Sequence, residues 1–295
     1  MAFKFINPNR KKSYLGDFLD SISLCNWTKV KKAMTNNLSD LINLKKYDIS
    51  AIGSKPYEAL ISLCHKQIDT NGLCLLSDFV TNSFYDGVIA EVKDNEEKGF
   101  YNESWRSPFG IESTKAQENS IQTRASMKTF AYDLLALNSK LRLLYESDIF
   151  TEFLKKILRV DNFFKCADPL VSCLVASLKD DDELGWHYDP NDGVVTLLLQ
   201  KPDKGGEFEF VPNSKESNHE VSEKELSIVD NQYEDIISLA QDPGTLAIFN
   251  GSNSLHRVAP VAGNSERIVA VLSYSEVPDF IFSSKIRKNF LGRSS

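Results

Sequence analysis

The chain has 295 residues, of which 42% are hydrophobic, and these can fill the core of one large domain or of two small ones. Its net charge of −7 argues against binding to the phosphates of a nucleic acid. It contains no run of eighteen apolar residues and no signal-peptide pattern, so we expect a cytoplasmic protein that does not enter a membrane. The five cysteines form no C-x-x-C pair, which predicts reduced thiols.

Residues 1–165 are predicted to be mainly helical. Asp148 is a helix start signal, and the apolar residues after it recur at the spacing of one helix face: Ile149, Phe150, Phe153, Leu154, Ile157 and Leu158. Residues 131–144 show a similar pattern. Residues 94–99 and 102–122 are polar and broken by glycine or proline, which predicts loops that could cover a substrate.

Residues 166–278 are predicted to form short antiparallel strands. Four pairs of turn residues separate runs that are apolar or alternate between polar and apolar: Asp192-Gly193, Gly205-Gly206, Pro243-Gly244 and Asn250-Gly251. This spacing is typical of a sandwich or jelly roll. Residues 214–241 interrupt the pattern with one short helix predicted at 233–239, and residues 279–295 are expected to form a C-terminal tail.

His187, Asp189 and His256 are candidate metal ligands. His187 and Asp189 are two residues apart on a predicted strand, so their side chains point to the same side of a sheet. Taken alone, such a pair is more often a surface pair or a structural histidine. His256 opens a later strand, and two histidines with one carboxylate can hold one face of an octahedral metal, as in non-haem Fe(II) oxygenases.

Arg267 strengthens the metal interpretation. It follows His256 by eleven residues and begins an otherwise apolar strand. A guanidinium inside a barrel is costly without an anionic partner, and its fork of donors binds a carboxylate through two hydrogen bonds. We therefore expect Arg267 to pair with an organic carboxylate, for which the C5 carboxylate of 2-oxoglutarate is the natural candidate.

Five segments resemble the Fe(II)/2-oxoglutarate-dependent oxygenases: residues 185–189, 195–200, 205–212, 243–246 and 255–258. Within that family, the chain is most similar to the branch that holds the free-amino-acid (lysine-type) radical halogenases and their hydroxylase relatives. The resemblance covers about residues 140–278 well and the first 140 poorly. It implies an α+β fold in which a double-stranded β-helix (jelly-roll) core, residues 166–278, carries a mainly helical N-terminal part packed on it.

The resemblance also implies the cofactors and the reaction. Fe(II) would be held by His187, Asp189 and His256, 2-oxoglutarate would bind the iron and pair with Arg267, and O2 would be the oxidant. In the halogenases the carboxylate position is glycine or alanine, which leaves room for a halide. The same position here is Asp189, so the resemblance implies hydroxylation rather than halogenation.

Further residues are candidates for contacts with 2-oxoglutarate or substrate. Thr196 and Ser273 lie on predicted core strands and could donate hydrogen bonds, Thr196 to 2-oxoglutarate, although strand hydroxyls are common without such a role. Trp186 could line the substrate pocket or belong to the core. Arg124, in the helical half, could hold a substrate carboxylate by a loose positional match to the amino-acid branch, or be an exposed helix residue.

Two carboxylates complete the list of candidates. Asp168 and Asp192 could bind a substrate ammonium, although Asp192 is also explained by the turn that it forms with Gly193. The sequence does not predict the oligomeric state.

We expect a small-molecule substrate, a free amino acid or a similar compound, that is hydroxylated at an unactivated C–H bond. The same cofactor chemistry could give desaturation or cyclisation, or act on a peptide or protein side chain. The acidic charge counts against a nucleic-acid substrate. A jelly roll that binds without catalysis would be expected to lack one of four residues, and the chain has all four: His187, Asp189, His256 and Arg267.

Overall fold

The computed structural model of the chain describes residues 38–109, 121–189, 193–216 and 221–295. Its helices are α3 (Lys55–Asn71), α4 (Asn82–Asp94), α5 (Lys140–Glu146), α6 (Asp148–Leu158), α7 (Glu223–Val229) and α8 (Ser284–Leu291), with two short 3-10 helices, η1 (Glu96–Lys98) and η3 (Tyr132–Leu134). None of the helices in these ranges has the length and apolar character needed to cross a membrane.

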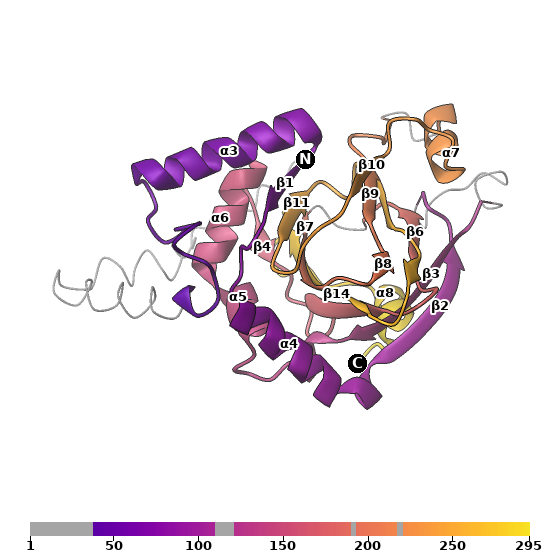
Figure 1. Cartoon of the computed structure of the whole chain (residues 1–295), viewed down its shortest axis with the longest axis horizontal. Helices are drawn as coiled ribbons and strands as arrows, with labels where there is room; N and C mark the ends of the chain where they lie inside the picture. The colour runs from indigo at the N-terminus through magenta and orange to yellow at the C-terminus, as the bar shows by residue number, and fades with distance from the viewer. Residues whose placement is uncertain (1–37, 110–120, 190–192, 217–220) are drawn as a thin grey trace, which may run out of the picture.

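The main sheet is antiparallel and curls around a central space (Figure 1). In the described residues its strands are β1 (Leu73–Leu76), β2 (Phe100–Arg106), β3 (Thr123–Phe130), β4 (Phe164–Lys165), β5 (Cys173–Leu178), β6 (Leu184–His187), β7 (Gly193–Gln200), β9 (Phe208–Val211), β10 (Ile237–Leu239), β11 (Leu246–Phe249), β12 (Leu255–Val258) and β14 (Arg267–Ser275). Their order is β1-β11-β7-β14-β5-β3-β6-β12-β9-β10, with β2 beside β3 and β4 beside β14. Two short strands, β8 (Lys204–Gly205) and β13 (Val261–Ala262), pair separately.

Helices α3, α4, α5 and α6 lie along one side of the curled sheet (Figure 1). Helix α6 begins where the sequence predicts, because the Ser147 side chain caps it by accepting the N–H of Phe150. Its apolar face is buried in a core that also holds outward-facing side chains of the sheet. On β14 these are Ile268, Ala270, Leu272 and Tyr274, so the alternate residues of that strand, beginning with Arg267, face the inside of the curl.

The strands predicted between residues 193 and 275 are confirmed, but three other predictions are corrected. Residues 102–106, predicted as part of a loop, belong to β2, and Arg124 lies on strand β3 instead of a helix. Strand β2 pairs only with β3 among the described residues. Its half-buried positions, Phe100, Asn102, Ser104 and Arg106, are mostly polar, and Tyr101 and Trp105 are exposed, so the strand shows no regular alternation of apolar and polar residues. The helix predicted at 233–239 is instead α7, and residues 237–239 form β10.

Strands from before residue 165 therefore belong to the same sheet as the strands that follow it. The predicted boundary marks a change from helix-rich to strand-rich chain within one layered fold. The C-terminal residues, expected to be a tail, include α8, which packs on β2 and β3.

Asp168 anchors this C-terminal part. One of its oxygens accepts the N–H groups of Leu170 and Val171, and the other accepts from the N–H of Phe282 and from Arg287 Nε at 2.8 Å. The residue is 1% exposed. Asp168 was a candidate ligand of a substrate ammonium, but both of its oxygens accept hydrogen bonds from the protein itself. Its contacts are therefore structural.

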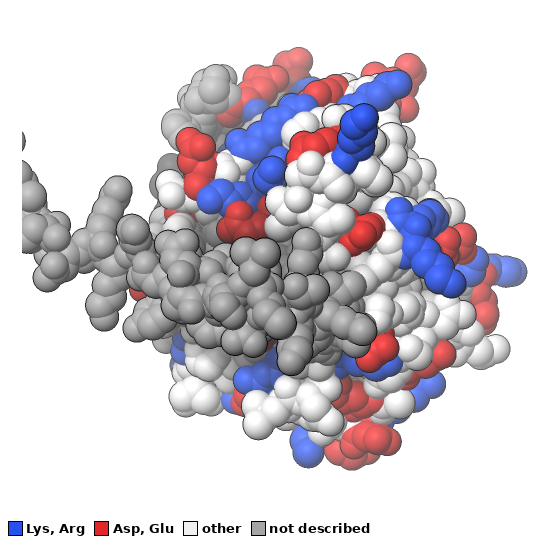
Figure 2. Space-filling view, turned by 90° about the vertical axis from the view of Figure 1, so that its left-hand side faces the viewer, with Lys and Arg blue, Asp and Glu red and all other residues white. Residues whose placement is uncertain are grey.

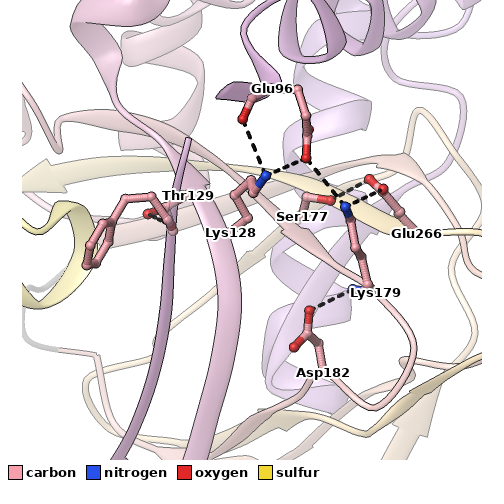
Figure 3. A network of polar contacts seen from close by, with 8 residues as sticks. Glu96, Lys128, Thr129, Ser177, Lys179, Asp182 and Glu266 are labelled. Carbon is pink, nitrogen blue, oxygen red and sulfur yellow. Dashed lines mark hydrogen bonds and ion pairs between the residues drawn. The ribbon is translucent and has the colours of Figure 1, made fainter. Parts of the chain in front are cut away.

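A second polar network lies at the start of β14 (Figure 3). Lys179 contacts Glu96 at 3.4 Å and Glu266 at 3.5 Å, and Glu96 also pairs with Lys128. Ser177 Oγ donates to Glu266 at 2.7 Å. These partly exposed pairs contribute little free energy singly. Together they link β3, β5 and η1 to the residue that directly precedes Arg267, and so they help to fix where that arginine enters the sheet.

Candidate metal centre

The three candidate metal ligands meet on the inner face of the curled sheet. His187 on β6 lies directly opposite His256 on β12 in the antiparallel register, and their ring centroids are 4.1 Å apart. Asp189 Oδ1 is 3.8 Å from His187 Nε2 and 3.5 Å from His256 Nε2. The three ligand atoms lie within 4.8 Å of one another. Such separations fit three ligands that each reach about 2.1 Å to one ion.

Backbone carbonyls fix the orientation of both imidazole rings. His187 Nδ1 lies 2.9 Å from the carbonyl oxygen of Gly185, and His256 Nδ1 lies 2.9 Å from that of Ser254. Because a carbonyl only accepts, each Nδ1 donates and each Nε2 keeps a lone pair for a metal. Burial, with His256 and Arg106 nearby, lowers the pKa of His187 well below its ordinary value, which favours the neutral, metal-binding form.

The carboxylate of Asp189 lacks a partner on one side. Its Oδ2 atom is buried and accepts no hydrogen bond from a described residue. Its N–H donates to the carbonyl of Gly251 at 3.0 Å, and a Cβ atom added to Gly251 would lie 1.8 Å from Oδ2. The Asn250-Gly251 pair was predicted only as a turn, whereas the structure shows that this glycine leaves room for the carboxylate. An orphaned oxygen beside two free Nε2 atoms fits a bound cation.

Arg267 is buried at the start of β14 and faces the inside of the curl. Its Nε donates to the carbonyl of Gly206 at 2.9 Å, but its Nη1 is buried without a hydrogen-bond partner among the described residues. Burial lowers its pKa to about 10, so the group stays charged at neutral pH. It lines a cavity of about 190 Å³ together with Leu198, Phe208 and Gln241, whose Nε2 is also buried and unpaired. A cavity with two unpaired donors fits a carboxylate.

Arg106 is a site residue that the sequence reasoning missed. It ends β2, and its Nε is buried with no hydrogen-bond partner among the described residues. Burial lowers its pKa to about 10, while the negative charge of Asp189 acts in the opposite direction. Because Arg106 also lowers the pKa of His187, its positive charge lies close to the triad. No sequence signal marks it, because the half-buried positions of β2 that precede it are mostly polar.

Two predicted hydroxyl residues lie near this inner face. Thr196 on β7 pairs with Val271 on β14, and Ser273 is two residues further along the same strand. Both therefore share the face of the sheet that carries Arg267. Thr196 is half-buried and Ser273 is buried.

Two other predicted substrate residues point elsewhere. Trp186 is 1% exposed, faces away from His187 and packs with Ile228 and Leu255, so it belongs to the core and not to the pocket wall. Arg124 Nε donates to Glu103 at 2.9 Å, and further carboxylates of residues 181 and 183 lie 3.3 and 3.8 Å from its Nη1. Its charge is already compensated. Asp192 lies outside the described residues.

Gly251→Ala tests whether this glycine sets the position of Asp189. The added methyl group would overlap the carboxylate, so we expect metal affinity to fall by about 10–100-fold, the loss typical of residues that orient a metal ligand. Anaerobic Fe(II) titration measures the change. Gly87→Ala is the matched control, because its new methyl group would have only Lys140 Cδ within reach, at 4.0 Å. Equal affinity in Gly251→Ala and the control would contradict the assignment.

Comparisons with solved structures place the fold. The epimerase SnoN from nogalamycin biosynthesis, in complex with Fe3+, alpha ketoglutarate and nogalamycin RO, is 11% identical over 74% of this chain and 84% of its own, with a TM-score of 0.53. A Trichoplax adhaerens prolyl hydroxylase in complex with a hypoxia inducible factor peptide fragment is 17% identical over 74% and 90%, with a TM-score of 0.50. The carbocyclase SnoK from nogalamycin biosynthesis is 9% identical over 72% and 82%, with a TM-score of 0.51. These likenesses show that the curled sheet with its helices is the jelly-roll fold of 2-oxoglutarate/Fe(II) oxygenases.

Sequence comparison gives the family. No curated protein matches this chain. The family model of halogenase D matches residues 58–286, which include every candidate metal ligand and both buried arginines. With the His–Asp–His triad and the fold, this match gives Fe(II) as the metal and 2-oxoglutarate and O2 as co-substrates. The chain belongs to the halogenase D family of 2-oxoglutarate/Fe(II) oxygenases.

Proposed function

We propose that this oxygenase hydroxylates an unactivated C–H bond of a free amino acid or an amino-acid-like small molecule. The observation that carries the proposal is the position of Asp189, whose Oδ1 lies 3.8 and 3.5 Å from the two candidate histidine ligands. By the resemblance stated above, a halogenase leaves this position open for halide. A carboxylate that fills it favours hydroxylation, although the family carries a halogenase name.

The chain's own residues would bind and orient the reactants. His187, Asp189 and His256 would hold Fe(II), which with O2 and 2-oxoglutarate supplies the oxidising chemistry and releases succinate. Arg267 would pair with the far carboxylate of 2-oxoglutarate, because it lines a cavity and its Nη1 has no hydrogen-bond partner among the described residues. Thr196, on the same face, is the proposed second donor to that co-substrate.

An apolar wall would keep water from one side of the metal. The rings of Phe249 and Phe208 lie 5.0 and 5.8 Å from the ring of His256, and both are buried with Phe210 in one cluster. Exclusion of water strengthens the charge interactions inside a site and limits side reactions.

The proposed substrate class is supported by Arg106. The buried Nε of Arg106 has no hydrogen-bond acceptor among the described residues, and a substrate carboxylate would provide an acceptor and a negative charge. Arg106 thus replaces Arg124 as the proposed ligand of a substrate carboxylate. A residue within a peptide chain lacks that free carboxylate, so Arg106 favours a free amino acid over a peptide.

Charge and cysteine use support the rest of the proposal. On the face drawn in Figure 2, the described basic and acidic side chains are interspersed, so that face has no uniformly basic surface for a nucleic-acid backbone. Cys64, Cys74 and Cys173 are buried free thiols. Free thiols fit the reducing cytoplasm that we propose as the place of action.

Product analysis tests the reaction type. The enzyme is loaded anaerobically with Fe(II) and 2-oxoglutarate, mixed with free amino acids in high chloride and then exposed to O2. We expect a product with one added oxygen atom, formed together with succinate, and no chlorinated product. Chlorination by the wild type would contradict the role of Asp189, loss of two hydrogen atoms would show desaturation or cyclisation, and turnover with peptides alone would contradict the substrate class.

Arg267→Ala tests the co-substrate site. Loss of a buried, charge-assisted pair costs about 2–5 kcal/mol, so 2-oxoglutarate affinity should fall strongly while Fe(II) affinity stays near that of the wild type. Anaerobic calorimetric titration measures both. Arg124→Ala, which removes an arginine already paired with carboxylates, is the control. If 2-oxoglutarate bound equally well to Arg267→Ala, the arginine would be structural.

Arg106→Gln tests the substrate site. The wild type should prefer an amino acid over its carboxamide, because the carboxamide cannot form an ion pair with Arg106. In the variant that preference, measured as the ratio of the two KM values, should be largely lost, while 2-oxoglutarate affinity is unchanged. A variant that still discriminates as the wild type does would show that Arg106 does not bind the carboxylate.

A further inference from the structure

The outer neighbours of both candidate histidine ligands contact one short segment of chain, residues 222–233, which includes α7. His187 lies between Trp186 and Tyr188, and His256 follows Leu255. These neighbours point away from the metal centre because side chains alternate along a strand. They form one cluster with Ile228 of α7, which is fully buried.

A chain of hydrogen bonds connects α7 to β6 and β12, the two strands that carry the candidate histidine ligands. Tyr188, between two candidate ligands, donates from its hydroxyl to Glu225 Oε1 at 2.7 Å. The same hydroxyl lies 3.3 Å from Ser214 Oγ, which accepts the N–H of Leu255 at 2.6 Å. Ser214 is completely buried. The carboxylate on α7 is thus linked to the residue between His187 and Asp189 and to the residue before His256.

Glu225 has a second task in the same helix. Its Oε2 accepts from the N–H of Ser222 at 2.8 Å, and Ser222 Oγ accepts the N–H of Glu225, which together form the capping box that begins α7. Glu225 is 4% exposed and forms no ion pair with a described residue. A buried carboxylate of this kind depends on its hydrogen bonds. The Glu225 carboxylate therefore both caps the start of α7 and binds the hydroxyl of Tyr188.

Trp186 contacts the C-terminal end of the segment. Trp186 Nε1 donates to Asn231 Oδ1 at 3.2 Å. The guanidinium of Arg257, the residue after His256, lies 4.9 Å from the centre of the Trp186 indole and donates to Glu209 at 2.6 Å. The segment thus braces β6 and β12 from outside, on the face opposite the candidate ligands.

We propose that Tyr188 and Glu225 are positioning residues for the metal, and that docking of α7 is thermodynamically coupled to metal binding. A metal held by His187, Asp189 and His256 would restrict the backbone of Tyr188 and so favour its bond to Glu225. Because linkage is reciprocal, α7 docking and metal binding stabilise each other by the same free energy. This inference rests on the proposed metal site, but not on the identity of the substrate or on turnover.

The test measures Co(II) affinity by absorption titration and amide hydrogen exchange of residues 223–229 with and without Co(II). In the wild type, Co(II) should slow exchange in α7. Tyr188→Phe, which removes only the hydroxyl, should bind Co(II) about tenfold more weakly and lose most of this metal-dependent protection. Glu225→Ala should have the same effect from the helix side, and the double variant should be no weaker than either single variant.

Tyr233→Phe is the matched control, because it removes a tyrosine hydroxyl from the same segment that makes no hydrogen bond with a described residue. It should behave as the wild type does. Unchanged Co(II) affinity and unchanged metal-dependent protection in Tyr188→Phe would overturn the proposal, even if the metal-free variant unfolded more easily. A wild type that binds no Co(II) would instead contradict the metal site itself, so the two failures can be told apart.

Discussion

The register between β6 and β12 is the constraint on which the rest of the site depends. It places His187 directly opposite His256, so both imidazoles reach the same point inside the curl. Because side chains alternate along a strand, a slip of one residue would turn one histidine to the outer face and bring Trp186 or Leu255 inward. The backbone carbonyls that orient the rings would move with it. Strand pairing thus places the two histidines, whereas Asp189 lies beyond the end of β6 and is positioned by its contact with Gly251.

Buried positive charge determines which ligands the site can bind. Two arginines each carry a buried nitrogen that has no hydrogen-bond partner among the described residues, Arg267 in the lining of a cavity and Arg106 near Asp189. Each costs stability in the absence of an anion, and each becomes favourable when a carboxylate arrives. The two positions lie on different strands, so they can select two different carboxylates. This arrangement would allow a co-substrate and a substrate that are both carboxylic acids to bind near one metal, each at its own arginine.

The strands, the triad and Arg267 could be predicted from the sequence, because turn residues and alternating apolar runs define β7, β9, β11 and β14. Arg106 could not, since an edge strand rich in polar side chains resembles a loop in sequence. Arg124 was assigned to the helical half, and only the structure shows that it lies on β3 beside acidic partners. The role of Glu225 depends on a contact with Tyr188, 37 residues away, and no local pattern reports a contact at that separation.

Iron and 2-oxoglutarate are proposed to bind between the triad and Arg267. The most direct measurement is diffraction from crystals grown anaerobically with Fe(II) and 2-oxoglutarate, with anomalous data at the iron edge. We expect one iron peak bound by the Nε2 atoms of His187 and His256 and by the carboxylate of Asp189, with the far carboxylate of 2-oxoglutarate at Arg267. Iron at another position, or 2-oxoglutarate that leaves Arg267 unpaired, would contradict this account.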